Sequence, residues 1–381
     1  MRDDLPVWRS LMFVPVTAEK FVRTGADKGA DAIILDLEDA VAPSQKDHAR
    51  TLIADAIPQV NRNGADVVVR VNRPWRMLVR DIEAAVIPGV TALMLTKVDS
   101  PEHVWAVAEM VDELEAERGL PPGKIKFLVL VETAVGFFRI EHIAKAHPRI
   151  VGLSLGSEDF AADVGAQSEP EALFYPKQQT VFAARAAGIL PMGFVGSIAD
   201  FRDQDAFRAI VRRSRRLGFM CASAIHPLQV PVLNDEFQPT EAEVERAQKM
   251  VAAYDKAYAE GLGAVQFEGA MIDVPVVNRA QSVLKRAAAL KARFDAACLP
   301  RIESDSHIVP LHVGEAALCT AVSRRLLAEF AMYATPINYP TVPRGEERLR
   351  FTPTPLHTDA MMDSLVEALL AIIPQERRKA A

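Results

Sequence analysis

The apolar sequence IKFLVLV at residues 125–131 ends directly at a carboxylate, Glu132. A short run of consecutive apolar residues is typical of a parallel strand that is covered on both faces. Seven further runs of this kind occur before residue 226, and segments with helical character separate them. These runs comprise residues 11–16, 32–37, 67–71, 92–98, 150–155, 192–195 and 219–225.

The segments between the runs have the periodicity of amphipathic helices. Residues 101–118, for example, place valine, alanine and leucine on one stripe and acidic residues on the other face. Parallel strands require crossover helices, and eight such strands can close a sheet. The alternation therefore predicts an α/β fold, a (β/α)8 TIM barrel. An open doubly wound sheet is the alternative, although no GxGxxG motif follows the first run.

Beyond about residue 290 the pattern changes to that of a small α+β segment. We expect a barrel domain with its C-terminal lid over residues 1–289 and a separate segment over residues 290–381, which is marginal in size for an independent core. Residues 306–313 and 348–352 are predicted strands, residues 315–330 and 357–373 are predicted helices, and residues 337–343 are extended and rich in proline.

The composition excludes several classes of function. The chain has 381 residues, of which 50% are hydrophobic, and 44 basic against 50 acidic side chains give a net charge of −6. An acidic chain lacks the electrostatic signature of a nucleic-acid or anionic-membrane binder, and no apolar run approaches the roughly 18 residues of a membrane helix. Three widely spaced cysteines and an acidic N-terminus without a signal-peptide pattern favour a reducing, cytoplasmic location.

Charged residues follow most of the predicted strands. In a barrel the carboxyl ends of all strands meet at one rim, where the active sites of this fold lie. Packing does not explain charged residues at the ends of successive strands, so we expect a catalytic rim. Its members are Asp36, Glu38, Asp39, Arg70, Asn72, Lys97, Glu132, Glu158, Asp159 and His226.

Structural roles for the same residues remain open. The acids at residues 36–39 could lie at the start of a loop and helix, and Asp159 could cap its helix. Arg70 could be an internal ion-pair partner for these acids. Glu132 ends a strongly apolar run, where a carboxylate is costly unless it is paired or bound to a metal.

Glu132 and Asp159 follow neighbouring strands and offer only oxygen ligands. Two carboxylates with water completing the coordination shell suit Mg²⁺ rather than Zn²⁺. A cation there calls for an anionic substrate, and the planar guanidinium of Arg70 can bind a carboxylate at two points. These residues indicate a metal-assisted step on a small 2-oxo or 2-hydroxy acid but do not name the bond that breaks. Further candidates for substrate contacts are Asp36, Glu38 and Lys97.

Several motifs occur in order along the barrel segment: RSLMFVP at 9–15, ILDLEDAV at 34–41, VRVN at 69–72, VETA at 131–134, GSEDFAAD at 156–163 and AIHP at 224–227. From about residue 9 to 286 the chain resembles the HpcH/HpaI aldolase and citrate lyase β-subunit family. The resemblance implies an oligomeric TIM barrel, trimeric or hexameric, with Mg²⁺, acyl-CoA or acyl-thioester substrates and 2-oxo acids. Family members cleave or form carbon–carbon bonds in malyl-, citramalyl- or citryl-thioesters, and some are malate synthases.

The resemblance also implies roles for individual residues. Glu132 and Asp159 match the metal ligands, and Arg70 matches the arginine that binds the substrate carboxylate. The sequence GAMIDVP at 269–275 resembles a lid supplied by a neighbouring subunit, which makes Asp273 the candidate for acid–base chemistry. Taken alone, Asp273 would be a loop acid.

Two departures from the family pattern lie near the expected substrate. Threonine stands at position 96 where proline is common, and Ala134-Val135 stands where many members have a Pro-Arg or Ala-Arg pair. We expect these differences to affect substrate identity more than the metal site.

The C-terminal segment contains SHIVP at 306–310, PINYPTVPRG at 336–345 and ERLRFTP at 347–353. Over about residues 290–373 it resembles the C-terminal part of 5-aminolevulinate synthase, a pyridoxal-phosphate enzyme. The resemblance implies that Arg350 matches the arginine for the amino-acid carboxylate and Thr341 a nearby substrate contact. The large domain with its Schiff-base lysine is absent, so we expect this segment to be inert and the chain to be a fusion.

The leading prediction is a Mg²⁺-dependent lyase that acts on a 3-hydroxy-dicarboxyl-CoA thioester or catalyses the reverse condensation. One alternative is an acyltransferase related to 5-aminolevulinate synthase, which the missing lysine domain disfavours. Another is a non-catalytic barrel that binds acyl-CoA. Because the tail closely follows the expected lid, we also expect it to perturb assembly, so that truncation after about residue 290 raises activity or sharpens the oligomer size.

Overall fold

The computed structural model describes residues 2, 5–196, 202–238, 241–274, 277, 289–304, 308–330, 332–353, 357 and 359–373. The chain divides into two compact units, Met1–Phe237 and Gln238–Ala381. Residues 238–274 therefore group with the C-terminal residues by their contacts. The domain boundary at residues 289/290, which rests on the sequence pattern, stays a prediction.

Eight parallel strands form the framework of the first unit, in the order β7-β6-β5-β4-β3-β2-β1-β8. Neighbouring strands in space are consecutive in the chain except where β8 joins β1, which is the arrangement of a barrel. The strands are β1 (Ser10–Pro15), β2 (Ala32–Asp36), β3 (Asp66–Val71), β4 (Ala92–Leu95), β5 (Lys126–Val131), β6 (Ile150–Leu155), β7 (Leu190–Met192) and β8 (Ala222–Ala224).

The last two strands close the sheet. Met192 and Cys221 form a parallel bridge, and the backbone N–H of Gly193 donates to the carbonyl of Cys221 at 2.8 Å. The N–H of Met220 donates to the carbonyl of Pro191 at 3.0 Å. These contacts join β7 to the start of β8 and confirm the predicted (β/α)8 barrel.

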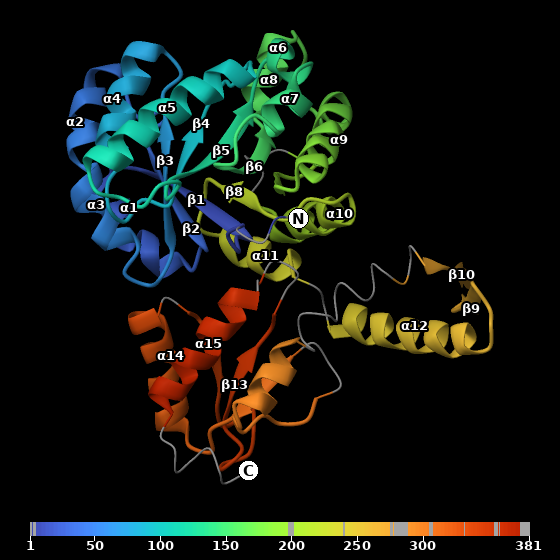
Figure 1. Cartoon of the computed structure of the whole chain (residues 1–381). Coiled ribbons are helices and arrows are strands. Elements are labelled where there is room, and N and C mark those ends of the chain that lie inside the picture. The colour runs from blue at the N-terminus through green and yellow to red at the C-terminus, as the bar shows by residue number, and fades with distance from the viewer. Residues whose placement is uncertain are drawn as a thin grey trace. The chain divides into compact units, whose positions relative to one another are not determined.

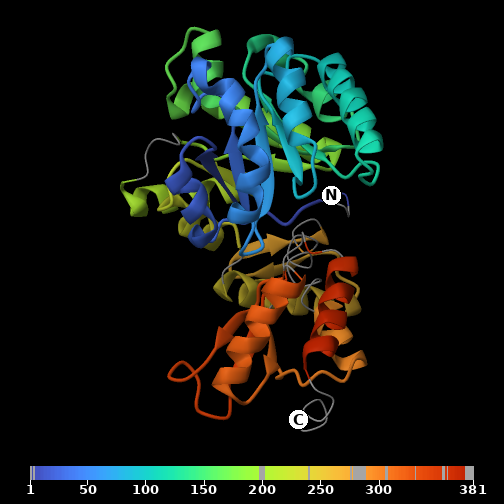
Figure 2. The ribbon, with the colours of Figure 1, turned by 90° about the vertical axis from the view of Figure 1, so that its left-hand side faces the viewer.

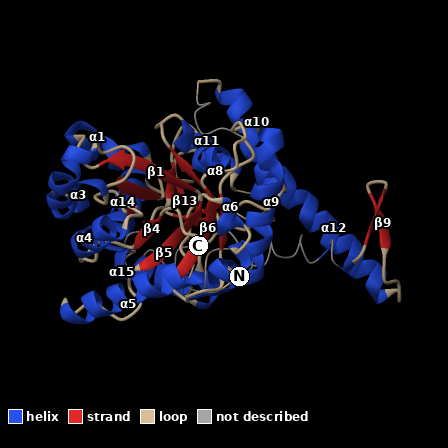
Figure 3. Cartoon of the chain, turned by 90° about the horizontal axis from the view of Figure 1, so that it is seen from above, coloured by secondary structure: helices blue, strands red, loops and turns tan. Residues whose placement is uncertain are grey.

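Helices surround the strands, as Figure 1 and the view from above in Figure 3 show. A continuous hydrophobic core includes residues from strands and helices, among them Leu35, Val69, Val129, Val107 and Val211. The helices are α1 (Glu19–Gly25), α2 (Lys46–Thr51), α3 (Ile53–Val60), α4 (Trp75–Ala85), α5 (Pro101–Glu117), α6 (Ala134–Phe137), α7 (Ile140–Ala144), α8 (Ser157–Asp163), α9 (Pro170–Ala187), α10 (Gln204–Arg216) and α11 (Gln229–Glu236), with short 3₁₀ turns at Ala26–Lys28 and Pro43–Gln45.

Three predicted barrel strands differ from the observed ones by more than one residue at an end. The seventh begins and ends earlier than predicted, because Gly193, with φ 124°, takes the chain out of extended geometry. The fourth stops at Leu95, since Lys97 has φ 50°. The eighth is confined to Ala222–Ala224. Apolar runs therefore located the strands, whereas positive φ angles set two of their ends.

The second unit contains a three-stranded antiparallel sheet in the order β11-β13-β12 with helices beside it (Figure 2). This confirms the predicted α+β segment, although residues 306 and 307 of the first predicted strand lie outside the described residues. Its core joins Leu311 and Leu349 of the sheet to helix residues such as Leu326 and Leu369. The elements are α12 (Glu241–Ala259), the hairpin β9 (Val265–Phe267) and β10 (Ala270–Ile272), β11 (Val309–His312), α14 (Ala316–Phe330), β12 (Thr335–Ile337), β13 (Arg348–Phe351) and α15 (Asp359–Ile372).

In the described part of the chain, no helix combines the length and the apolar character needed to cross a membrane.

Candidate active site

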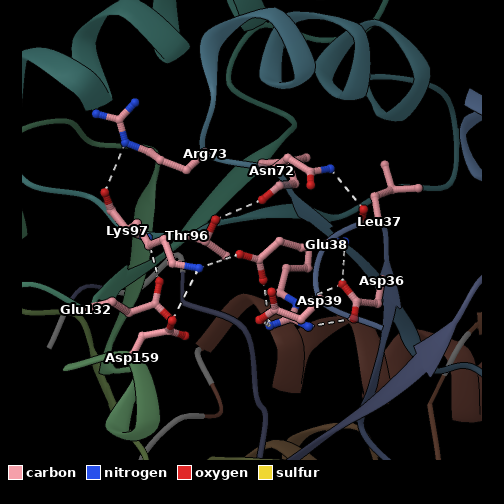
Figure 4. Close-up of polar contacts among 12 residues, drawn as sticks. Asp36, Leu37, Glu38, Asp39, Asn72, Arg73, Thr96, Lys97, Glu132 and Asp159 are labelled. Atoms are coloured by element: carbon pink, nitrogen blue, oxygen red, sulfur yellow. Dashed lines mark hydrogen bonds and ion pairs between the residues drawn. The ribbon is translucent and has the colours of Figure 1, made fainter. Parts of the chain in front are cut away.

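The structure brings the main barrel candidates together at the carboxyl ends of β2 to β6. Asp36 ends β2, and Arg70 is the penultimate residue of β3. Lys97 follows β4, and Glu132 directly follows β5. Asp159 lies in the first turn of α8, after β6. Figure 4 shows the carboxylates of Glu132 and Asp159 side by side, both facing Lys97.

Asp36 holds Arg70 by a two-point ion pair. The Nε and Nη2 groups of Arg70 donate to Oδ1 and Oδ2 of Asp36 at 2.7 and 2.6 Å. Asp36 is 1% exposed, and its two oxygens also accept the backbone N–H groups of Glu38 and Ala40. The carboxylate of Asp36 is thus engaged within the protein, and its predicted contact with the substrate stays a prediction.

The remaining terminal nitrogen of Arg70 faces two further acids. Nη1 lies 2.9 Å from a carboxylate oxygen of Glu38 and 3.5 Å from one of Asp39. Burial alone would lower the pKa of Arg70, but the hydrogen bonds and the charge of Asp36 raise that pKa above its ordinary value. Arg70 is therefore the internal ion-pair partner that the sequence had left as an alternative. The Nη1 group of Arg70 lies next to the 61%-exposed Asp39, so this side of the guanidinium is nearest to solvent.

Lys97 links three carboxylates through both its backbone and its side chain. Its backbone N–H donates to Oε2 of Glu132 at 2.6 Å. Its Nζ donates to Oε1 of Glu38 at 2.9 Å and lies 3.5 Å from Oδ1 of Asp159. The left-handed backbone at φ 50° directs the N–H at Glu132. Burial alone would lower the pKa of Lys97, but the hydrogen bond with Glu38 and the charge of Glu38 raise that pKa above its ordinary value.

Glu132 is 4% exposed, so its side chain is buried. Burial, together with the charges of Glu38 and Asp159, raises the pKa of Glu132 to about 7. Its other oxygen faces Gly156, the residue between β6 and α8. A Cβ atom at position 156 would lie 2.3 Å from Oε1 of Glu132, so only glycine fits there without displacing the carboxylate.

Glu132 and Asp159 offer oxygen ligands for one hard cation. Asp159 is not the cap of its helix: α8 has Gly156 at its N-cap and no side-chain cap hydrogen bond. Its side chain is 44% exposed and accessible to solvent. Within the described residues, no three His, Cys, Asp or Glu side chains are grouped closely enough to hold a metal. A two-carboxylate set fits Mg²⁺, which retains several waters.

The second unit contains three further predicted site residues, Asp273, Thr341 and Arg350. Asp273 is exposed and directly follows β10. Arg350, in the middle of β13, pairs with Pro310 and Thr335 of the neighbouring strands, whereas Thr341 lies in an exposed turn. Their assigned roles stay predictions.

Two buried charged residues behind the rim were absent from the sequence-based candidates. They are Lys46 of α2 and Asp81 of α4, which are 9% and 0% exposed. Both occur in segments with ordinary helical polarity, so no local pattern marked them as buried. The only signal was their position on helices that follow the charged ends of β2 and β3.

Comparison with known proteins identifies the barrel. The model of the HpcH/HpaI aldolase/citrate lyase family matches residues 9–227. The chain is 34% identical to citrate lyase subunit beta of Leuconostoc mesenteroides subsp. cremoris, over 73% of this chain and 93% of that protein. The chain belongs to the HpcH/HpaI aldolase/citrate lyase family. The resemblance inferred from its motifs is therefore confirmed, and the chain is a member of a family of lyases.

The chain is also similar to a malyl-CoA lyase and to a solved CitE structure. L-malyl-CoA/beta-methylmalyl-CoA lyase of Rhodobacter capsulatus is 32% identical over 73% of this chain and 94% of that protein. A crystal structure of CitE from Mycobacterium tuberculosis in complex with magnesium, acetoacetate and coenzyme A is 28% identical, with a TM-score of 0.60. That comparison covers 75% of this chain and all of the other.

A second family model, aminotransferase class I and II, matches residues 215–369. This match is consistent with the expected resemblance of the tail to a pyridoxal-phosphate enzyme. It begins earlier than the predicted tail and overlaps the lyase match at residues 215–227.

Proposed function

We propose that this chain is a Mg²⁺-dependent carbon–carbon lyase. Its substrate is a 3-hydroxy-dicarboxyl-CoA thioester of the malyl, citramalyl or citryl type, which it cleaves to a 2-oxo acid and an acyl-CoA, or forms by condensation. The observation that carries the proposal is the convergence of Glu132 and Asp159 at Lys97, next to the ion-paired Arg70. The magnesium, coenzyme A and acetoacetate named for the Mycobacterium tuberculosis structure support it.

Glu132 and Asp159 would hold the metal, which when bound supplies Lewis-acid polarisation of a substrate oxygen. Arg70 contributes a fixed cation, because Asp36 clamps its guanidinium through two hydrogen bonds. A substrate carboxylate binds at Nη1 of Arg70 by replacing the distant, exposed carboxylate of Asp39. Cations positioned in advance stabilise developing oxygen charge without reorganisation at the moment of reaction.

Lys97 and Asp273 complete the proposed machinery. The ammonium of Lys97 is 32% exposed and can donate to a substrate oxygen while it remains near Glu38. Asp273 is proposed for proton transfer because its segment resembles the family lid. A lid from a neighbouring subunit would require a homo-oligomer, a trimer or a hexamer, which size-exclusion chromatography with light scattering tests.

A substrate screen tests the proposed function. We expect the full chain to release glyoxylate, pyruvate or oxaloacetate from one of the three thioester types, with release abolished by EDTA and restored by Mg²⁺. Absence of release from all three, in protein that binds Mg²⁺, contradicts the proposal and favours the non-catalytic acyl-CoA-binding barrel.

Apparent Mg²⁺ affinity should depend on pH. A metal ligand must be deprotonated, and burial raises the pKa of Glu132 to about 7 in the metal-free protein. We therefore expect the dissociation constant to fall about tenfold per unit as pH rises from 5 to 6.5, and to level off above about 7. Calorimetric titration with MgCl₂ measures this dependence. A flat profile over that range contradicts the assignment of Glu132 as a ligand.

Gly156→Ala should weaken Mg²⁺ binding. The new methyl group would overlap the carboxylate of Glu132, which must move away from Lys97 to make room. We expect a loss of affinity of about 10- to 100-fold, which is typical when a residue that orients a metal ligand is substituted. Gly263→Ala, at a position with no atom within 4 Å of the added Cβ and no positive φ angle, is the matched control. Equal affinities for the two variants contradict the prediction.

The aminotransferase match favours a second candidate, an acyltransferase related to 5-aminolevulinate synthase. Titration with pyridoxal phosphate tests it, and we expect no internal-aldimine absorbance band.

Truncation after residue 290 tests the proposed effect of the tail on assembly. Higher activity or a sharper oligomer size supports this effect, and no change in either contradicts it.

A further inference from the structure

The acidic turn after β2 is fixed from behind by a buried lysine. The Nζ of Lys46 donates to the backbone carbonyls of Leu37 and Glu38, at 2.7 and 2.6 Å. These carbonyls belong to the two residues that directly follow Asp36. The lysine therefore contacts the main chain of the turn, while the carboxylate of Glu38 extends to Arg70 and Lys97.

The turn also has three internal hydrogen bonds, and the carbonyl of Glu38 accepts one of them. The N–H groups of Glu38 and Ala40 donate to the carboxylate of Asp36, at 2.8 and 3.2 Å. The N–H of Val41 donates to the carbonyl of Glu38 at 3.0 Å. That carbonyl thus accepts both from the turn and from Lys46, so the ammonium is part of the hydrogen bonding that defines the turn.

A second buried group supports the same segment. The side-chain amide of Asn72 donates to the carbonyl of Leu37 at 2.9 Å and to Oδ2 of Asp81 at 2.7 Å. The other oxygen of Asp81 accepts from Nε of Arg50 at 2.7 Å. Lys46 and Arg50 are four residues apart and lie on the same face of α2. Helix α2 therefore contacts the turn directly through Lys46 and indirectly through Arg50.

We propose that Lys46 is a positioning residue of the lyase site, which holds residues 36–41 in the conformation that presents Glu38 to Arg70 and Lys97. The proposal rests on the proposed function. Lys46 contacts neither Glu132 nor Asp159 in any hydrogen bond that the structure shows, so its influence is on the Arg70 side of the site. The role of Lys46 is more than a general electrostatic one, because its ammonium donates hydrogen bonds to two specific carbonyls.

The charge of Lys46 is suited to this role. Burial lowers its pKa, and the surrounding charges of Asp36, Glu38, Asp81 and Asp39 act in the opposite direction. A neutral side chain of similar length would leave the carbonyls of Leu37 and Glu38 without this donor. Arginine would retain the charge and the donors, although its planar group is larger.

The test compares Lys46→Met, Lys46→Arg and Arg149→Met in the full chain. Arg149, which is 3% exposed, pairs with the buried Glu115 and directly precedes β6, at the amino end of the barrel. Its loss breaks a buried charge network on the side opposite the candidate site. Arg149→Met therefore controls for loss of stability alone.

Four measurements are made on each variant: the melting temperature, amide hydrogen exchange of residues 38–41, Mg²⁺ affinity, and pyruvate affinity with saturating Mg²⁺. For Lys46→Met we expect faster exchange at these amides, Mg²⁺ affinity within about twofold of wild type, and pyruvate affinity lowered about 10- to 100-fold. Lys46→Arg should restore most of the protection and affinity. Arg149→Met should lower the melting temperature without changing exchange at residues 38–41 or pyruvate affinity.

Unchanged exchange at residues 38–41 in Lys46→Met overturns the proposal, as does an equal loss of pyruvate affinity in Arg149→Met. Failure of the proposed function has a different signature, because the wild type then releases no 2-oxo acid from any thioester. Hydrogen exchange still decides the role of Lys46 in that case: local loss of protection supports it, and unchanged protection overturns it.

Discussion

Glu132→Gln should abolish Mg²⁺-dependent turnover while the barrel stays folded. Glutamine has nearly the same size but lacks the negative charge that a hard divalent cation requires. The metal is proposed to supply several kcal/mol of transition-state stabilisation, so we expect a loss of at least about a thousandfold in kcat. Steady-state kinetics and calorimetric titration with MgCl₂ measure the loss, and Asp159→Asn should behave similarly.

The control for Glu132→Gln is Glu117→Gln, an exposed acid at the end of α5. It should retain wild-type kinetics and Mg²⁺ affinity. If Glu132→Gln and Asp159→Asn both turn over at the wild-type rate, the metal assignment is wrong.

Glu132→Gln should also change the pH dependence of stability. Burial raises the pKa of Glu132 from its ordinary value of 4.5 to about 7, so the folded metal-free protein binds the proton more tightly than the unfolded chain. Its stability therefore decreases as pH increases through this window. Glu132→Gln removes this loss, and we expect its melting temperature to exceed that of the metal-free wild type at pH 8.

Arg70→Met should have the largest effect on stability. Asp36 and Glu38 are 1% and 6% exposed, and without Arg70 the carboxylate of Asp36 would keep only backbone donors. Breaking a buried ion pair from one side costs about 3–5 kcal/mol. We expect a decrease of this size in the free energy of unfolding by urea at pH 7, together with loss of turnover.

Two further variants separate the causes of this effect. Arg70→Lys retains the charge but not the two-point contact with Asp36, so it should recover part of the stability and little of the turnover. Arg80→Met removes a 51%-exposed arginine that lies 3.2 Å from Asp47, and it should cost no more than about 1 kcal/mol. An Arg70→Met protein as stable as Arg80→Met contradicts the prediction.

The fold was largely predictable from local patterns. The apolar run at residues 125–131 became β5, and the helical stripe at residues 101–118 became α5. Strands and helices of this kind are recognisable because burial on two faces, or on one stripe, constrains the sequence at every position. The extent of β7 was predicted wrongly, because the strand has only three residues and is followed by a glycine whose φ angle the sequence does not reveal.

The candidate site was predictable in its members but not in their contacts. Charged residues after successive strands indicated a rim that contains Glu132 and Asp159. The pairing of Arg70 with Asp36 and Glu38 was one of two open alternatives, since a guanidinium serves a substrate and a neighbouring acid equally well. The left-handed backbone of Lys97 and the burial of Lys46 had no local signature.

Sequence alone established that this chain alternates buried strands and amphipathic helices, that its family motifs occur in order, and that charged residues follow most of its strands. These properties depend on residue type and spacing, which are fully present in the chain. Only the tertiary structure decided which carboxylate each cation contacts, why residue 156 must be glycine, and that Lys46 supports the acidic turn. These contacts join residues from different strands, turns and helices, and their distances are set by packing of the whole barrel.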